Sequence, residues 1–150
     1  MENRIITITR EKKGTSVIVR SVAQMNALAR RMLKGVHGGD VLALSGELGA
    51  GKTTFVQGLA KAARIAEQIT SPTFVLMKIY ALPQSVNNIE QLCHIDAYRL
   101  ESGADLAAIG AQEYIGDART LTVIEWPERV KELIPRMAIQ VSFDYTMSSP

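Results

Sequence analysis

The chain has 150 residues, enough for one domain with a hydrophobic core but short for a core plus an independent second lobe. Hydrophobic residues make up 47% and charged residues 21%, which excludes whole-chain disorder, and aromatic residues, at 5%, are too sparse for a base-stacking platform that binds single-stranded nucleic acid. Seventeen basic and fifteen acidic side chains give a formal charge of +2, too nearly balanced for a strong attraction to nucleic acid.

The chain begins with a segment that we expect to be an extension, residues 1–14. Residues 15–20 (TSVIVR) are rich in β-branched side chains and predict a short strand. Ser21 can cap a helix after this strand. The apolar positions of that helix recur at helical spacing: Met25, Leu28, Ala29 and Met32.

A buried strand and a helix follow, on either side of a glycine-rich segment. Residues 37–40 (HGGD) are typical of a turn, and the continuous apolar run 41–44 (VLAL) predicts a strand buried on both faces. Apolar residues return at helical spacing over residues 52–63. The glycine-rich segment therefore connects the end of a strand to the start of a helix.

Further strands are predicted in the second half of the chain. Residues 73–82 (TFVLMKIYAL) and 91–96 (QLCHID) indicate strands, joined by a hairpin or an exposed loop over residues 83–90. Residues 121–125 (LTVIE) predict another buried strand, and residues 137–145 a final one.

Helical segments lie between and after these strands. Residues 104–115 have helical composition interrupted at Gly110, which predicts two short helices meeting at a turn. A last helix is expected over residues 127–133, with Pro127 in its first turn. Alternating strands and helices predict an α/β fold with helices packed against a sheet, in one domain over residues 15–145, followed by a frayed tail at 146–150.

The glycine-rich segment matches the phosphate-binding pattern G-x-x-x-x-G-K-[ST] without a gap or substitution. It consists of Gly46, Glu47, Leu48, Gly49, Ala50, Gly51, Lys52 and Thr53. The glycines let successive N–H groups point at phosphate oxygens, and the helix that follows adds its positive end. Lys52 is expected to reach the β- and γ-phosphates, and Thr53 the Mg²⁺ shell. The alternative is a glycine-rich turn that binds nothing, which the flanking strand and helix disfavour.

Two carboxylates stand at the ends of predicted strands, Asp96 and Glu125. In open α/β sheets ligands bind beyond the carboxyl ends of the strands, so either residue is a candidate to hold the metal or to orient a water. Alternatively, each caps the next helix or pairs with Arg99 or Arg129. His94 shares a face with Asp96, but Mg²⁺ prefers oxygen ligands, and we expect a structural role for the histidine.

Two further residues have open interpretations. Thr73 lies in the segment Thr-Ser-Pro-Thr-Phe before a strand, where a switch NTPase has a threonine that senses the γ-phosphate, although an ordinary Ser-Pro turn explains the segment equally well. Trp126 follows Glu125 and lies either near the nucleotide or a partner, or in the core.

Four segments, GELGAGKTT, TSPTF, HIDAYRL and LTVIEWPER, together and in this order resemble the TsaE (YjeE) family over residues 22–145. This family is the P-loop ATPase of bacterial tRNA threonylcarbamoyladenosine biosynthesis. The resemblance implies a P-loop NTPase fold with a mixed, mainly parallel sheet, and ATP and Mg²⁺ as cofactors. It also implies TsaB and TsaD as partners, weak ATP hydrolysis that the partners stimulate, and contact with tRNA only through the complex.

The resemblance also implies roles for individual residues. Lys52 would contact the phosphates, Thr53 and Glu125 the Mg²⁺, and Asp96 the catalytic water or the metal shell. Thr73 would belong to a switch-like loop. Thr54 and Trp126 would complete the nucleotide site.

Other functions of a phosphate-binding loop remain as alternatives. A small-molecule kinase usually has an arginine-rich lid, which is not evident here, and a guanine-specific switch has an N-K-x-D motif, which is absent. A nucleotide-dependent scaffold with little hydrolysis of its own is the third possibility.

Cellular location follows from what the chain lacks. Cys93 is its one cysteine and cannot form an internal disulfide, and residues 1–14 contain no apolar stretch of signal-peptide type. No segment approaches the roughly 18 consecutive apolar residues that span a bilayer. We therefore expect a cytoplasmic protein that does not enter the membrane.

Overall fold

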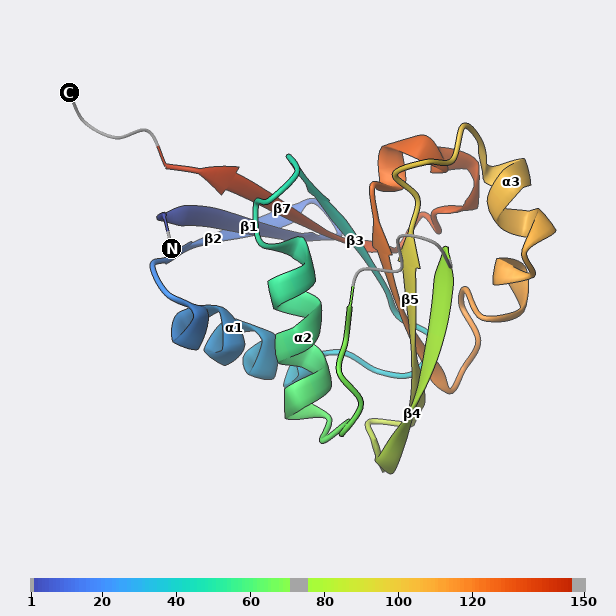
Figure 1. Ribbon diagram of the computed structural model, residues 1–150, viewed down its shortest axis with the longest axis horizontal. Helices are drawn as coiled ribbons and strands as arrows, with labels where there is room; N and C mark the ends of the chain where they lie inside the picture. The colour runs from blue at the N-terminus through green and yellow to red at the C-terminus, as the bar shows by residue number, and fades with distance from the viewer. Residues whose placement is uncertain (1, 71–75, 147–150) are drawn as a thin grey trace.

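The computed structural model describes residues 2–70 and 76–146. Its strands form a mixed sheet in the order β2-β1-β7-β3-β6-β5-β4 (Figure 1). The strands are β1 (Arg4–Arg10), β2 (Lys13–Val19), β3 (Val41–Gly46), β4 (Met77–Val86), β5 (Ile89–Asp96), β6 (Thr120–Glu125) and β7 (Ile139–Tyr145). The helices are α1 (Val22–Gly35), α2 (Lys52–Ala62) and α3 (Gly103–Ala108), with 3₁₀ turns η1 (Ala111–Glu113), η2 (Pro127–Arg129) and η3 (Lys131–Leu133).

The centre of the sheet is parallel and its edges are antiparallel. Strands β7, β3, β6 and β5 pair in parallel, whereas β1 pairs antiparallel with β2 and β7, and β4 with β5. The predicted α/β fold is therefore confirmed. The carboxyl ends of β3, β6 and β5 meet at one edge of the sheet, because Leu44 pairs with Glu125 and Glu125 with Asp96.

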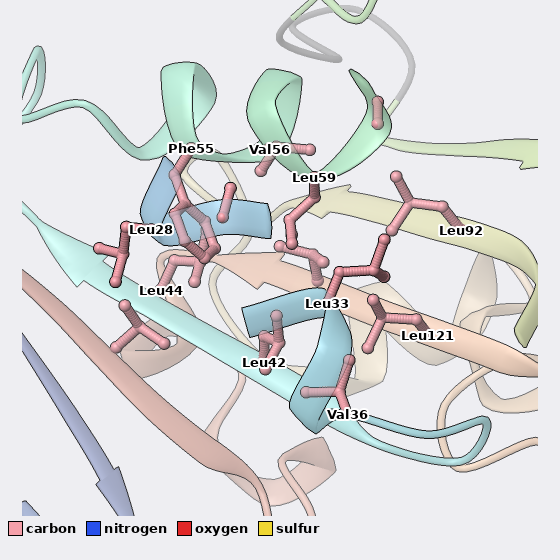
Figure 2. Close-up of a cluster of buried hydrophobic side chains, with 14 of the residues drawn as sticks. Leu28, Leu33, Val36, Leu42, Leu44, Phe55, Val56, Leu59, Leu92 and Leu121 are labelled. Atoms are coloured by element: carbon pink, nitrogen blue, oxygen red, sulfur yellow. The ribbon is translucent and has the colours of Figure 1, made fainter. Parts of the chain in front are cut away.

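Each face of the sheet has its own hydrophobic cluster, because alternate side chains of a strand point to opposite faces. On one face, α1 and α2 cover Leu42 and Leu44 of β3. Figure 2 shows Leu28 and Leu33 of α1 gathered with Leu42 and Leu44 of β3. Phe55, Val56 and Leu59 of α2 belong to the same cluster. The other cluster includes Val41, Ile95 and Ile124 and packs against Leu106 of α3. This arrangement gives three layers, α/β/α.

Helix α1 begins as the sequence predicts. The Ser21 hydroxyl accepts a hydrogen bond from the backbone N–H of Gln24 at 3.1 Å. The Gln24 side chain in turn accepts one from the backbone N–H of Arg20 at 2.6 Å. The first of these bonds satisfies an N–H group that the first turn of a helix leaves without a partner, and the second fixes the residue just before the cap. The helix buries Met25, Leu28, Ala29 and Leu33.

The N-terminal residues belong to the sheet. From the sequence, residues 1–14 were expected to be an extension instead. Strand β1 lies between β2 and β7 and buries Ile6 completely. It turns into β2 at Glu11 and Lys12, whose φ angles are 49° and 69°. Such turns usually have Asn, Asp or Gly at these positions, so the sequence has no recognisable turn signal between the two strands.

Strand β4 ends later, and strand β5 begins earlier, than the sequence predicts. Of the two alternatives for residues 83–90, the hairpin is confirmed: β4 continues through Pro83 to Val86, on an edge strand where a proline is tolerated, and pairs antiparallel with β5. Asn87 and Asn88, with φ angles of 51° and 65°, make the turn. The Asn87 side chain donates to the carbonyl of Val36 at 3.0 Å, so the hairpin tip also holds the end of α1. The predicted start of the strand, at residue 73, lies outside the described residues.

The segments after β5 are short. As predicted, the helical region ends before Gly110 and resumes as the turn η1. The single helix expected over residues 127–133 is instead two 3₁₀ turns, because Val130 between them has a non-helical backbone, with a φ of −135° and a ψ of 38°. No helix in the described part of the chain has the length and apolar character needed to cross a membrane.

The buried thiol of Cys93 provides a test of the fold. Burial raises its pKa from 9.0 to about 12, which leaves about a thousandfold less thiolate in mildly alkaline solution, since each pH unit is a factor of ten. We expect a disulfide reagent to label the native chain at least that much more slowly than the chain unfolded in urea. The unfolded thiol loses its proton above its ordinary pKa and the folded one does not, so this group also lowers stability as the pH rises from 9.0 toward 12. Rapid stoichiometric labelling of the native chain would contradict the position of β5.

Candidate functional site

A cavity of about 320 Å³ lies beyond the carboxyl ends of β3, β5 and β6, beside the start of α2. This is the position at which open α/β sheets bind ligands. The cavity is lined by Leu48, Gly49, Gly51, Lys52, Thr53, Thr54, Leu76, Asp96, Tyr98, Arg99, Glu125 and Trp126.

The glycine-rich loop connects β3 to α2 in a conformation that requires its glycines. A Cβ atom at Gly46 would lie 2.7 Å from the carbonyl oxygen of Phe143 on the neighbouring strand β7. Gly51 has a φ of +107°, which other residues rarely adopt. The loop thus brings the N-terminus of α2, with its unpaired N–H groups and positive end, to the wall of the cavity.

Lys52 is the buried cation of the site, with only 4% of its surface exposed. Its Nζ donates to the carbonyl of Gly46 at 2.5 Å and lies 3.6 Å from the ring centroid of Trp126. Burial lowers the pKa of Lys52, and the nearby carboxylates of Glu125, Glu128 and Asp96 oppose this shift. Because Lys52 lines the cavity, its ammonium group can make charge-assisted hydrogen bonds to an anion bound there.

Glu125 is held between a histidine and a threonine and is 3% exposed. Its Oε2 lies 2.6 Å from His94 Nε2, and its Oε1 accepts from the hydroxyl of Thr53 at 3.5 Å. An ionised carboxylate only accepts hydrogen bonds, so Nε2 is the donor. His94 is fully buried, and its Nδ1 has no partner among the described residues, so the ring is tied to the site through Glu125.

Asp96 and the aromatic residues form the outer part of the cavity. Asp96 Oδ1 accepts from the backbone N–H of Tyr98 at 3.0 Å, so the carboxylate shapes the turn after β5 as well as lining the cavity. The rings of Tyr98 and Trp126 are 5.0 Å apart, and the guanidinium of Arg129 lies 5.8 Å from the Tyr98 ring. Trp126 both lines the cavity and packs against the second core cluster, so its two interpretations are compatible.

Residues that are far apart in the sequence line the same cavity. Of the residues proposed from the sequence, those on its wall are Leu48, Gly49, Gly51, Lys52, Thr53, Thr54, Asp96, Glu125 and Trp126. Gly46 contributes its carbonyl to Lys52, Glu47 is exposed, and Ala50 is buried behind the loop. Thr73 lies outside the described residues.

Three residues of the wall were not expected from the sequence: Leu76, Tyr98 and Arg99. Tyr98 and Arg99 come directly after Asp96, and their place just beyond a strand end is the signal that could have indicated them. His94 was expected to be structural, and its contact is with Glu125 rather than with the cavity.

Replacing His94 by leucine is expected to cost about 3 kcal/mol of stability, because it leaves a buried carboxylate without its closest partner. The measurement is the free energy of unfolding in urea. His37→Leu is the matched control, since the His37 side chain is 68% exposed. The double variant His94→Leu/Glu125→Leu should recover most of the loss, because it removes the orphaned charge. An equal loss in both histidine variants would show that the buried pair does not matter.

The residues present suit a Mg²⁺-nucleotide. Magnesium in nucleotide sites takes one or two protein oxygen ligands together with phosphate oxygens and water. Thr53, Glu125 and Asp96 supply a hydroxyl and two carboxylates on one wall, and the loop, Lys52 and the start of α2 supply donors for phosphate. The geometry therefore fits the anion and its cation together.

The sheet order, the loop between β3 and α2 and the buried lysine together define a P-loop nucleotide-binding fold. A solved structure agrees with this class: the crystal structure of YdiB from Bacillus subtilis aligns with a TM-score of 0.66 and 26% identity, covering 95% of this chain and 77% of YdiB.

Sequence comparison then identifies the family. Residues 19–149 match the profile of "Threonylcarbamoyl adenosine biosynthesis protein TsaE". The protein of that name from Treponema pallidum is 44% identical over 104 residues, which are 69% of this chain and 72% of the relative. The one from Streptomyces coelicolor is 40% identical over 111 residues, 73% of this chain and 72% of the relative. The chain belongs to the TsaE family, which acts in tRNA threonylcarbamoyladenosine biosynthesis.

Proposed function

We propose that this protein binds ATP with Mg²⁺ and hydrolyses it to support the TsaB–TsaD assembly in the threonylcarbamoyladenosine modification of tRNA. The observation that carries the proposal is the convergence of the buried Lys52 and the Glu125 carboxylate on one cavity at the end of a phosphate-binding loop. Membership of the TsaE family supports the pathway.

In this proposal the loop and Lys52 bind the phosphates. The N–H groups of the loop and of the first turn of α2 take the phosphate oxygens, and Lys52 exchanges its contact with the Gly46 carbonyl for the β- and γ-phosphates. The bound Mg²⁺ would neutralise charge that develops on the phosphates. The Trp126 ring lies over the Lys52 ammonium, 3.6 Å from its Nζ, and limits the access of water to it.

The carboxylates divide the remaining tasks. Glu125 is the candidate metal ligand with Thr53, because its Oε1 is within 3.5 Å of the Thr53 hydroxyl. Asp96 would orient the attacking water or a water of the metal shell; its position next to Glu125 in the sheet and on the wall of the same cavity supports this role. Thr73 would act as a switch-like residue that senses the γ-phosphate.

The proposed ATPase is slow alone and accelerated by its partners, as is common where nucleotide state controls an assembly. TsaD carries out the threonylcarbamoyl transfer, TsaB and TsaD contact this chain in the cytoplasm, and tRNA is reached only through the complex. The small formal charge of +2 is consistent with indirect contact with tRNA.

The test is Mg²⁺-dependent phosphate release from ATP by the purified chain, alone and with TsaB and TsaD, with Lys52→Ala as control. We expect release to rise with the partners and to vanish in the control. Transfer of phosphate to a small acceptor would indicate a kinase instead. Binding of ATP with no partner response would indicate a nucleotide-binding protein outside the assembly.

A further inference from the structure

The outer side of the phosphate-binding loop is held by two side chains from opposite ends of the chain. Arg4 on β1 donates from Nε to the carbonyl of Ala50 at 3.0 Å, and from a terminal nitrogen to the carbonyl of Gly49 at 3.3 Å. The Tyr145 hydroxyl on β7 donates to the same Gly49 carbonyl at 3.2 Å. Figure 1 shows β1 and β7 side by side, next to the loop that joins β3 to α2.

Arg4 and Tyr145 also contact each other. They are opposite residues in the antiparallel pairing of β1 with β7, and the Arg4 guanidinium lies 4.0 Å from the centroid of the Tyr145 ring. A guanidinium over an aromatic face is attracted by the ring, which fixes its plane. The two side chains and the two carbonyls therefore form one connected unit, which we call the loop clamp.

The burial of Arg4 shows how specific this arrangement is. Only 7% of its surface is exposed, and its remaining terminal nitrogen donates to the carbonyl of Glu2 at 2.7 Å. In the described part of the chain, no carboxylate lies within ion-pair distance of it. A buried charge is costly unless it is well hydrogen-bonded, so the backbone carbonyls, two of them from the loop, are what stabilise this cation.

The clamp determines how the loop peptides are oriented. In a trans peptide the C=O and the next N–H point in opposite directions. Arg4 holds the Ala50 carbonyl on the outer side, and this directs the N–H of Gly51 toward the cavity that Gly51 lines. The Ala50 N–H is meanwhile occupied by the carbonyl of Glu47 at 3.0 Å. The outer contacts thus prearrange an inner donor for a phosphate oxygen.

We propose that Arg4 and Tyr145 are positioning residues that set the backbone of the phosphate-binding loop for the nucleotide. Nucleotide affinity then depends on strand β1, which lies outside the residues 19–149 that match the family profile. This inference rests on the proposed function, since it requires that the loop bind a nucleotide. It adds a determinant of affinity that touches neither phosphate nor metal.

The test measures the dissociation constant for ATP with Mg²⁺ through the fluorescence of Trp126, the only tryptophan of the chain, which lines the cavity. For Arg4→Ala we expect about tenfold weaker binding, since charge-assisted hydrogen bonds to two carbonyls are lost. Arg4→Lys keeps the charge but not the fork and should fall between Arg4→Ala and the parent. Tyr145→Phe keeps the ring and should weaken binding about threefold.

Two control variants separate positioning from general effects. Arg10→Ala removes another β1 arginine, whose contacts are with Gly35 and Asp40 at the far end of the strand. Tyr80→Phe removes a buried hydroxyl that has no partner among the described residues. Both should bind ATP as the parent does. Each titration is made well below the melting temperature of its variant, so that a loss of stability alone does not change the dissociation constant.

The kinetic signature is a change in KM with little change in kcat, because the clamp acts on binding and leaves Lys52, Thr53 and Glu125 in place. Parent-like affinity in both Tyr145→Phe and Arg4→Lys, or an equal loss in Arg10→Ala, would overturn the inference and leave the proposed function intact. Absence of ATP binding by the parent chain would instead reject the proposed function.

Discussion

Glu125→Gln is expected to lower kcat for ATP hydrolysis about a hundredfold or more, the usual effect of removing a charged group that acts in the reaction. The substitution keeps the size of the side chain and its ability to hydrogen-bond with His94 and Thr53, so the fold should be retained. What it removes is the negative charge beside the Thr53 hydroxyl. We therefore expect ATP binding to survive and the Mg²⁺ concentration needed for activity to rise.

The measurement is phosphate release in the presence of the partners, as a function of ATP and of Mg²⁺. Glu128→Gln is the matched control: the same isosteric change on an exposed residue that influences Lys52 only through its charge. Parent-like hydrolysis by Glu125→Gln would remove this residue from the metal site and leave Asp96 as the carboxylate to test next.

The parts of the site that the sequence predicts are those that depend on contiguous residues. The loop motif fixes its own conformation because glycine, lysine and threonine stand at set spacings between a strand and a helix. Asp96 and Glu125 were recognisable because each ends a predicted strand, and parallel pairing then places both at one edge of the sheet. The capping of α1 by Ser21 is local in the same way.

The parts that the sequence does not reveal depend on long-range pairing. Arg4 contacts Ala50 across 46 positions, and Tyr145 contacts Gly49 across 96, so no local pattern connects them. Strand β1 escapes prediction for a related reason: its turn at Glu11 and Lys12 has a positive φ without the usual residues, and it is stabilised by its partners on both sides.

Lys52→Met is expected to weaken ATP binding about a hundredfold or more, because the variant loses charge-assisted hydrogen bonds to two phosphates. The same substitution should leave the melting temperature unchanged or raise it. Burial is the largest influence on the pKa of Lys52 and lowers it, which means that the folded chain disfavours the charged form. Methionine fills a similar volume without that penalty, and Glu125 keeps its contacts with His94 and Thr53.

In Lys52→Met, the dissociation constant for ATP should thus rise while the melting temperature stays the same or rises. A damaged fold would instead lower the melting temperature. Lys61→Met, an exposed lysine in the last turn of the same helix, should change neither quantity appreciably. A lower melting temperature in Lys52→Met would mean that the carboxylates around the ammonium outweigh its desolvation. The expected combination is weaker ATP binding with undiminished stability. It would show that the buried charge of Lys52 does not stabilise the fold and serves to bind the phosphates.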